Sequence, residues 1–245
     1  MAKTVNNMKS DWESRHKIEQ MKAVMGKDMP HEQFMSSGEE EVEKLFDDFT
    51  QIRALKSCIA IDFGCGPGRI SNALSNIFGK VIAVDISSTA LDSAKNNLKR
   101  HNNVHYILSE GESIPLGDSA ADFFISFDVF QHMPSADVQL NTLSEVSRVL
   151  KNNGTFFIQV KCNTGWIRIL GIPIFPRKFK KIIPLPIFNI WNFNKRDDRK
   201  KSTWRGTLMD YSSIREVFME KNLKITSIKP HGRDTRWMVK GICVK

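Results

Sequence analysis

The sequence predicts an α/β protein built on a doubly wound, mostly parallel sheet of seven strands. Three observations predict this fold. Between Cys58 and Val160, short apolar runs alternate with helical segments of about 10–15 residues, a pattern typical of βαβ units. A glycine-rich turn, IDFGCGPGR, follows the first apolar run. One more helical segment and two apolar runs end the chain and would complete the sheet.

The predicted strands are short apolar runs rich in β-branched and aromatic residues. They cover residues 58–63, 81–86, 104–108, 121–127 and 155–160, followed by a hairpin of 223–229 and 235–244. The predicted helices after the first strand cover residues 69–78, 88–101, 136–150 and 211–222. Apolar residues recur at helical spacing in the first of these helices, where Ile70, Ala73 and Leu74 share one face. That face would pack on the sheet.

Two helices are predicted before the first strand. One covers residues 11–24. The other begins near Ser36, where Ser37 and Glu40 would form a capping box, and it carries Val42, Leu45, Phe46, Phe49, Ile52 and Leu55 at helical spacing. We therefore divide the chain into an N-terminal helical cap (1–56), an α/β core (57–161), a basic and aromatic insert (162–208), and a C-terminal helix and hairpin that complete the core (209–245).

The net charge of +9 lies entirely in the insert. Residues 162–208 contain 11 Lys and Arg against 2 Asp and Glu, whereas the rest of the 245-residue chain contains 25 of each. The four cysteines form no C-x-x-C pair, which argues against a zinc site or a disulfide framework and fits a reducing compartment. A polar N-terminus and the absence of a long apolar run predict neither a signal peptide nor a membrane span. We expect a cytoplasmic protein.

The glycine-rich turn lies where an open parallel sheet binds ligands, beyond the carboxyl end of its first strand. Its glycines, Gly64, Gly66 and Gly68, follow G-x-G-x-G, so Arg69 stands where the dinucleotide fingerprint G-x-G-x-x-G needs its third glycine. The chain also lacks a G-x-x-x-x-G-K-[ST] phosphate loop. Asp85 ends the second predicted strand, where a carboxylate can accept hydrogen bonds from both hydroxyls of a ribose. The turn and Asp85 therefore indicate a nucleoside ligand.

Taken with Asp62 and the later stretch SEGESIPLGDSAADFFIS, these motifs resemble the class I S-adenosylmethionine-dependent methyltransferases, most closely the group that acts on small molecules. The match covers about Cys58 to Val160. The resemblance implies the Rossmann-like fold of that class, S-adenosyl-L-methionine as cofactor and S-adenosyl-L-homocysteine as product. The implied cofactor-binding residues are Asp62 at the amino group, Gly64, Gly66 and Gly68 along the methionine portion, Asp85 at the ribose, Ile86 on the adenine, Glu110, Gly111 and Glu112 in the turn after the third strand, and Ser126 and Phe127 near the sulfonium. Glu110 stands where the family usually has an aspartate.

Methyl transfer requires the acceptor to be aligned with the methyl group and, for a hydroxyl acceptor, the removal of a proton. His132 is the candidate base, because histidine accepts a proton near neutral pH, and Asp128 is the second candidate. A helix-capping role for His132 and a purely electrostatic role for Asp128 remain as alternatives. Enzymes of this superfamily that methylate exocyclic base amines carry an Asn- or Asp-Pro-Pro-aromatic stretch after the fourth strand, and SFDVFQ has none.

The insert has four open interpretations. As a substrate lid, its aromatic residues would line an acceptor pocket and its basic residues would bind an anionic group. As a membrane patch, WIRILGIPIF and IIPLPIF beside RKFKK would contact an anionic lipid surface, making the protein peripheral to a membrane. As a nucleic-acid patch, it would bind phosphates and stack on bases. The fourth interpretation is a solvated, charged loop.

The expected function is methyl transfer from S-adenosyl-L-methionine to oxygen or nitrogen of a small, anionic or sugar-like acceptor. The substrate candidates are Trp12, Arg15, Trp204 and Arg205. A lipid-linked or RNA acceptor bound through the insert and a non-catalytic S-adenosylmethionine-binding partner subunit remain as alternatives. No metal is expected.

Overall fold

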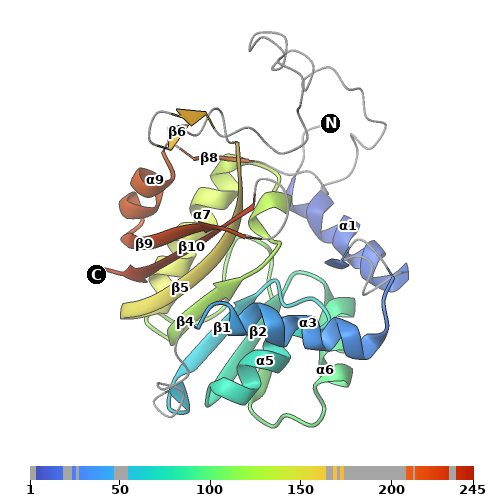
Figure 1. Ribbon diagram of the computed structural model, residues 1–245. Helices are drawn as coiled ribbons and strands as arrows, with labels where there is room; N and C mark the ends of the chain where they lie inside the picture. The colour runs from blue at the N-terminus through green and yellow to red at the C-terminus, as the bar shows by residue number, and fades with distance from the viewer. Residues whose placement is uncertain are drawn as a thin grey trace, which may run out of the picture.

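The computed structural model describes residues 4–18, 24–25, 28–46, 55–163, 168–169, 172–173, 208–211, 213–231 and 236–245. Its main sheet has the strand order β3-β2-β1-β4-β5-β10-β9 (Figure 1). These strands are β1 Ile59–Phe63, β2 Lys80–Asp85, β3 Val104–Leu108, β4 Ala121–Ser126, β5 Leu150–Asn163, β9 Leu223–Pro230 and β10 Arg236–Cys243. β1 to β5 pair in parallel, and β10 is antiparallel to both of its neighbours. The predicted seven-stranded, mostly parallel sheet is confirmed, as is the closing hairpin.

Three short strands lie outside this path. β8 (Met209–Asp210) pairs in parallel with the end of β5, and β6 (Arg168–Ile169) pairs with β7 (Ile172–Pro173) in a separate two-stranded ribbon.

Helices cover both faces of the sheet because alternate residues of each strand point to opposite sides. In Figure 1, α3 (His31–Glu43) and α5 (Arg69–Ile77) lie in front of the strands and α7 (Ala136–Val149) lies behind them. One core cluster joins strand residues such as Ala60 and Val81 to α3, α5 and α6 (Ser88–Asn97). The other joins Ile61 and Ile82 to α7 and α9 (Ile214–Glu220). The doubly wound arrangement is therefore confirmed.

The helices before β1 begin earlier than the sequence predicts. α1 spans Val5–Ile18, whereas its start was expected near residue 11. α3 begins at His31, directly after Pro30, so the expected capping box of Ser37 and Glu40 is wrong. The Ser37 hydroxyl instead donates to the Phe34 carbonyl at 2.6 Å within the helix. Proline fixes φ at a value suited to a helix start. The helix therefore begins after Pro30, although Ser37 is also a residue type common at helix N-termini.

A glycine sets the contact between α3 and α5. Gly38 lies on the buried face of α3 with Phe34 and Val42. A Cβ atom at Gly38 would lie 2.2 Å from the backbone carbonyl oxygen of Arg69, the first residue of α5. Only glycine permits this approach, so α3 presses against the helix that follows the glycine-rich turn.

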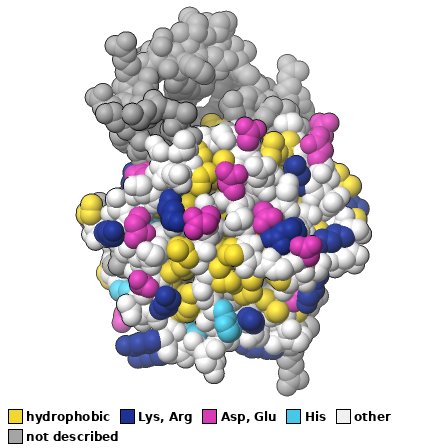
Figure 2. Space-filling view, turned by 180° about the vertical axis from the view of Figure 1, so that it is seen from behind, with side chains coloured by type: hydrophobic (Ala, Val, Ile, Leu, Met, Phe, Trp, Pro, Cys, Tyr) yellow, Lys and Arg dark blue, Asp and Glu magenta, His cyan; other side chains and the backbone are white. Residues whose placement is uncertain are grey.

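The described residues carry mixed charge on the surface. On the face shown in Figure 2, basic and acidic side chains lie interspersed, as the balanced count outside residues 162–208 predicts. Among the residues that the structure describes, no helix has the length and hydropathy needed to cross a membrane.

Candidate functional site

The carboxyl ends of β1, β2, β3 and β4 meet at one edge of the sheet, and the strand order reverses between β1 and β4. This reversal is the position where open α/β sheets bind their ligands. The glycine-rich turn leaves β1 there with positive φ at Gly64 (79°), Gly66 (53°) and Gly68 (93°). A Cβ atom at Gly64 would lie 2.1 Å from the Val129 side chain, so glycine is required by contact as well as by conformation. A Cβ atom at Gly66 would meet the Val24 side chain at 3.5 Å, an ordinary van der Waals contact, so at Gly66 the positive φ is what favours glycine.

Asp85 joins the end of β2 to this turn. Its Oδ2 accepts a hydrogen bond from the Gly66 backbone at 2.8 Å, and its Oδ1 accepts one from the Ser87 backbone at 2.9 Å. The carboxylate is buried, and burial raises the pKa of Asp85, although the nearby His16 ring opposes the rise. Each oxygen retains a lone pair for a further donor. Asp85 is therefore fixed at the site where the ribose was expected.

Asp62 is a second buried carboxylate beneath the same turn. It is 1% exposed and accepts a hydrogen bond from the Ser71 hydroxyl at 2.6 Å. Burial raises the pKa of Asp62 from 3.8 to about 7, while the Ser71 bond and the charge of Arg69 act in the opposite direction. Neither Asp62 nor Asp85 forms an ion pair with any residue that the structure describes. Two such carboxylates favour a ligand that is positively charged and carries hydroxyl donors.

In the turn after β3, Gly111 is buried against Ile86, whereas Glu110 and Glu112 lie at the surface. Gly111 has φ of 107° and lies against Ile86, because a Cβ atom there would be 3.0 Å from the Ile86 Cδ1. The Glu110 side chain is 75% exposed and pairs with Lys9 at 2.9 Å. Glu112 accepts from the Asn141 amide at 3.0 Å on the surface. Of these residues, Ile86 and Gly111 lie together, whereas both glutamates point toward solvent.

Ser109 holds this turn and was missed by sequence reasoning. Its buried hydroxyl donates to the Ser113 carbonyl at 2.8 Å and accepts from the Gly111 backbone at 2.9 Å. A serine directly after a strand and two residues before a glycine is the signal that could have identified it.

α1 covers the edge from above. Val5 reaches within 2.6 Å of the position that a Cβ atom of Gly111 would take, and Met8 is buried beside it. Glu13 accepts hydrogen bonds from Ser87 Oγ at 2.7 Å and Ser88 Oγ at 3.2 Å, and from the Thr89 hydroxyl. A hollow of about 360 Å³ remains between α1 and the ends of β2 and β3, lined by Asn6, Lys9, Ser10, Glu13, Ser88 and Leu108.

The end of β4 contributes Ser126, Phe127 and Asp128. The Ser126 hydroxyl is fully buried and has no hydrogen-bond partner, and Phe127 is buried beside it. Asp128 has a positive φ of 57°, pairs with Arg236 at 2.9 Å and accepts from the Gln131 amide at 2.6 Å. The ion pair gives Asp128 a structural partner, and its part in catalysis stays a prediction.

Three of the predicted acceptor-side residues lie together. Trp12 of α1 packs edge-on against His132 with ring centroids 5.1 Å apart, and His132 ends the short helix η2 (Phe130–His132). The Arg15 guanidinium lies 6.0 Å from the centre of the Trp12 ring and its Nε is 3.3 Å from Asp11. α1 thus brings the candidate substrate residues to the candidate base. Trp204 and Arg205 lie outside the described residues, as does most of the insert.

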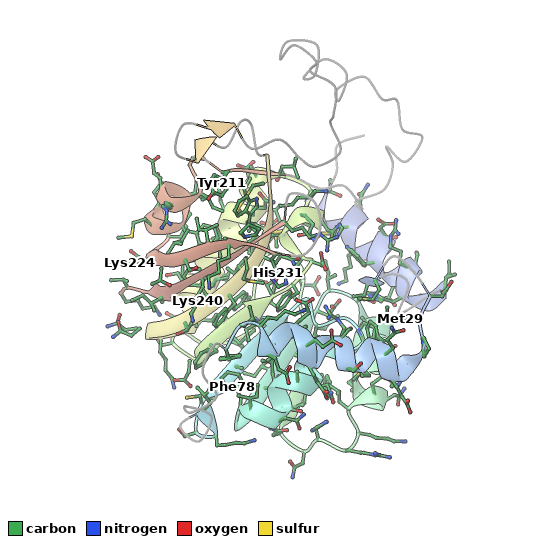
Figure 3. The ribbon with its side chains drawn as sticks, viewed as in Figure 1. Met29, Phe78, Tyr211, Lys224, His231 and Lys240 are labelled. Atoms are coloured by element: carbon green, nitrogen blue, oxygen red, sulfur yellow. The ribbon has the colours of Figure 1, made fainter. Side chains whose placement is uncertain are left out.

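A charged group beside this edge was also missed by the sequence. His231, near the centre of the molecule in Figure 3, hydrogen-bonds to Glu41 of α3 at 2.6 Å. That hydrogen bond is the main reason why the pKa of Glu41 is lowered. Arg69 is buried close by and donates to the Ser37 carbonyl at 3.1 Å. Residues so far apart in the chain give no local pattern from which their contact could be read.

Comparisons with known proteins agree with this arrangement. A family model described as a methyltransferase domain matches residues 61–158. The ubiquinone biosynthesis O-methyltransferase of Pelagibacter ubique is 25% identical over 120 residues, which cover 47% of this chain and 48% of that protein. The N-demethylindolmycin N-methyltransferase of Streptomyces griseus is 30% identical over 91 residues, which cover 37% and 38% of the two chains. The matched region thus spans half or less of these relatives.

Among solved structures, the magnesium protoporphyrin IX methyltransferase of Synechocystis PCC 6803 with bound SAH superposes with a TM-score of 0.67. The alignment covers 98% of this chain and 99% of that one at 12% identity, so it establishes a shared fold.

Proposed function

The chain belongs to the class I S-adenosylmethionine-dependent methyltransferases, and from this premise we propose that it transfers a methyl group from S-adenosyl-L-methionine to oxygen or nitrogen of a small acceptor. One observation carries the proposal. The Gly66 backbone N–H donates a hydrogen bond to the Asp85 carboxylate at 2.8 Å, at the carboxyl edge of β1 and β2 where we expect a nucleoside. A turn that served only to connect a strand to a helix would not need three glycines of positive φ.

The buried residues fit this cofactor chemically. S-adenosyl-L-methionine is a cation at its sulfonium, carries an ammonium group, and has two ribose hydroxyls. Asp62 and Asp85 are the buried carboxylates at the edge, and the unpartnered Ser126 hydroxyl can donate or accept. In the proposed complex, Asp85 accepts from the ribose and Asp62 stabilises the ammonium. The methionine portion would lie along the backbone of the turn at Gly66, where the positive φ favours a residue without a side chain.

The sulfonium supplies an activated methyl group, so this chain's residues need to orient the acceptor, exclude water and, for a hydroxyl acceptor, remove a proton. His132 ends η2, which follows β4, and the Trp12 ring packs edge-on against it. We assign His132 as the base for a hydroxyl acceptor and Trp12 as one wall of the acceptor pocket. For an amine acceptor that is neutral on binding, His132 only accepts the proton released after transfer.

The small, anionic or sugar-like acceptor is supported by two observations. The relatives are named for transfer to oxygen and to nitrogen, and both names refer to small organic compounds or their biosynthesis. The chain's entire positive excess lies in residues 162–208, next in sequence to β5, whose end lies at this edge. A basic segment there favours an acceptor bearing a carboxylate or phosphate, with Arg205 as its partner.

The test is a transfer assay with methyl-tritiated S-adenosyl-L-methionine and pairs of phenols and amines that differ only in a carboxylate. We expect label in the acceptor, with a preference for the carboxylated member that Arg205→Ala reduces about tenfold, the loss expected for one charge-assisted hydrogen bond. Lys99→Ala, at an exposed position after α6, is the matched control. Binding of S-adenosyl-L-homocysteine without label transfer to any acceptor would instead support the non-catalytic partner subunit.

A further inference from the structure

The buried face of α1 contains a histidine whose polar atoms are not used within the protein. His16 is 3% exposed. The Trp12 carbonyl lies near the ring, yet neither ring nitrogen makes a hydrogen bond of normal geometry. A buried imidazole without partners is costly, because water can no longer satisfy its donor and its acceptor. A ligand that brings a donor or an acceptor to the ring would remove this cost.

The position of His16 identifies which ligand. Its ring lies close enough to Asp85 for the charge of each residue to act on the pKa of the other. Burial is the largest influence on His16 and lowers its pKa, which favours the neutral imidazole. A neutral ring beside Asp85 can donate one hydrogen bond and accept another without adding positive charge next to a cationic cofactor.

α1 is held so that His16 stays at this place. Glu13, one turn earlier, accepts three hydroxyl hydrogen bonds from Ser87, Ser88 and Thr89 at the start of α6. Burial alone would raise the pKa of Glu13, but these hydrogen bonds outweigh it and lower the pKa to about 2, so Glu13 is ionised at neutral pH. Its negative charge also lies at a helix N-terminus, where it is favourable. These hydrogen bonds of Glu13 therefore hold α1 next to the loop that follows Asp85.

We propose that His16 is a cofactor-positioning residue: α1 closes over the carboxyl edge of β2, and the His16 ring hydrogen-bonds to the same ribose hydroxyls that donate to Asp85. The proposal rests on the proposed function, because it needs an adenosyl cofactor at that edge. It adds that the N-terminal helix is part of the binding site for the nucleoside and is more than a cover. The Trp12 ring, tilted against His16 at 5.6 Å and edge-on to His132 at 5.1 Å, then lies between the cofactor side and the acceptor side.

The test measures binding of S-adenosyl-L-homocysteine by calorimetry to the full chain and to His16→Phe, which keeps the ring volume and removes both nitrogens. We expect a dissociation constant about tenfold higher for the variant. His16→Gln replaces the ring by an amide that can still donate and accept hydrogen bonds, so it should bind more tightly than His16→Phe. Ser14→Ala, at an exposed position on the same helix, should leave the affinity unchanged.

A second ligand shows whether His16→Phe weakens binding through a lost hydrogen bond to the ribose or through a general change in the site. With the 2′,3′-dideoxy analogue of S-adenosyl-L-homocysteine, the wild type and His16→Phe should bind equally, since the hydroxyls that distinguish them are gone. Equal affinity of wild type and His16→Phe for S-adenosyl-L-homocysteine itself would overturn the proposal, as would an undiminished tenfold difference with the dideoxy analogue. Absence of binding by the wild type would refute the proposed function instead.

Discussion

Asp62→Asn should make the free energy of unfolding less dependent on pH. It should also remove part of the affinity for the cofactor. The fully buried Asp62 carboxyl has a pKa of about 7, raised by burial from 3.8. A raised carboxyl pKa means that the folded state binds the proton more tightly than the unfolded state. The associated stability is present below pH 3.8 and is lost as the pH rises to about 7. At 1.36 kcal/mol for each pH unit, the loss between pH 5 and pH 7 is about 2–3 kcal/mol.

The assay is chemical denaturation of the ligand-free protein at pH 5, 6, 7 and 8. The free energy of unfolding of Asp62→Asn relative to wild type should rise by about 2–3 kcal/mol from pH 5 to pH 7 and then level off. Any packing cost of the amide shifts the whole difference without changing its slope. Asp92→Asn, an exposed carboxylate paired with Lys95, should show no such trend. A pH-independent difference for Asp62→Asn would refute the claim that burial raises the pKa of the Asp62 carboxyl.

Two further predictions concern the frame of the site. Gly38→Ala should lower the free energy of unfolding by about 2–4 kcal/mol, because its Cβ would meet the Arg69 carbonyl at 2.2 Å. Gly117→Ala, at a position with no atom within 4 Å, should change the free energy of unfolding by no more than about 0.5 kcal/mol, as measured by thermal denaturation. Equal effects of the two substitutions would contradict the close contact between α3 and α5. Glu41→Gln should remove a stabilisation that exists above pH 4.5 and is lost as the pH falls through the lowered pKa of Glu41. Denaturation curves of Glu41→Gln and wild type should therefore converge in acid, and a constant gap down to pH 2 would show that the His231 hydrogen bond does not stabilise the charged form.

The sheet and the glycine-rich turn could be predicted from the sequence because each depends on residues that are neighbours in the chain. Apolar strands buried on two faces read as continuous apolar runs, and positive φ selects glycine at Gly64, Gly66 and Gly68. Asp85 was identified for the same reason, since it directly follows an apolar run. These features depend on a few neighbouring residues and need no knowledge of tertiary contacts.

The cover over the edge could not be predicted in this way. Gly38 lies within the helix predicted to begin near Ser36, and its role emerges only from the approach of Arg69. The roles of Glu13 and His16 depend on contacts with residues some 70 positions later in the sequence, near Ser87 and Asp85. The motif predicts a cofactor contact for Glu110, whose carboxylate pairs with Lys9 at the surface, and that contact stays a prediction.

The most direct test of the central claim is calorimetric titration of wild type and Asp85→Asn with S-adenosyl-L-homocysteine. Asparagine keeps the shape of the side chain and removes the charge that accepts from the Gly66 backbone and, in the proposed complex, from the ribose. The wild type should bind with micromolar affinity, and Asp85→Asn should bind about 10- to 100-fold more weakly, the range for charge-assisted hydrogen bonds. No binding by the wild type, or equal binding by Asp85→Asn, would contradict the central claim.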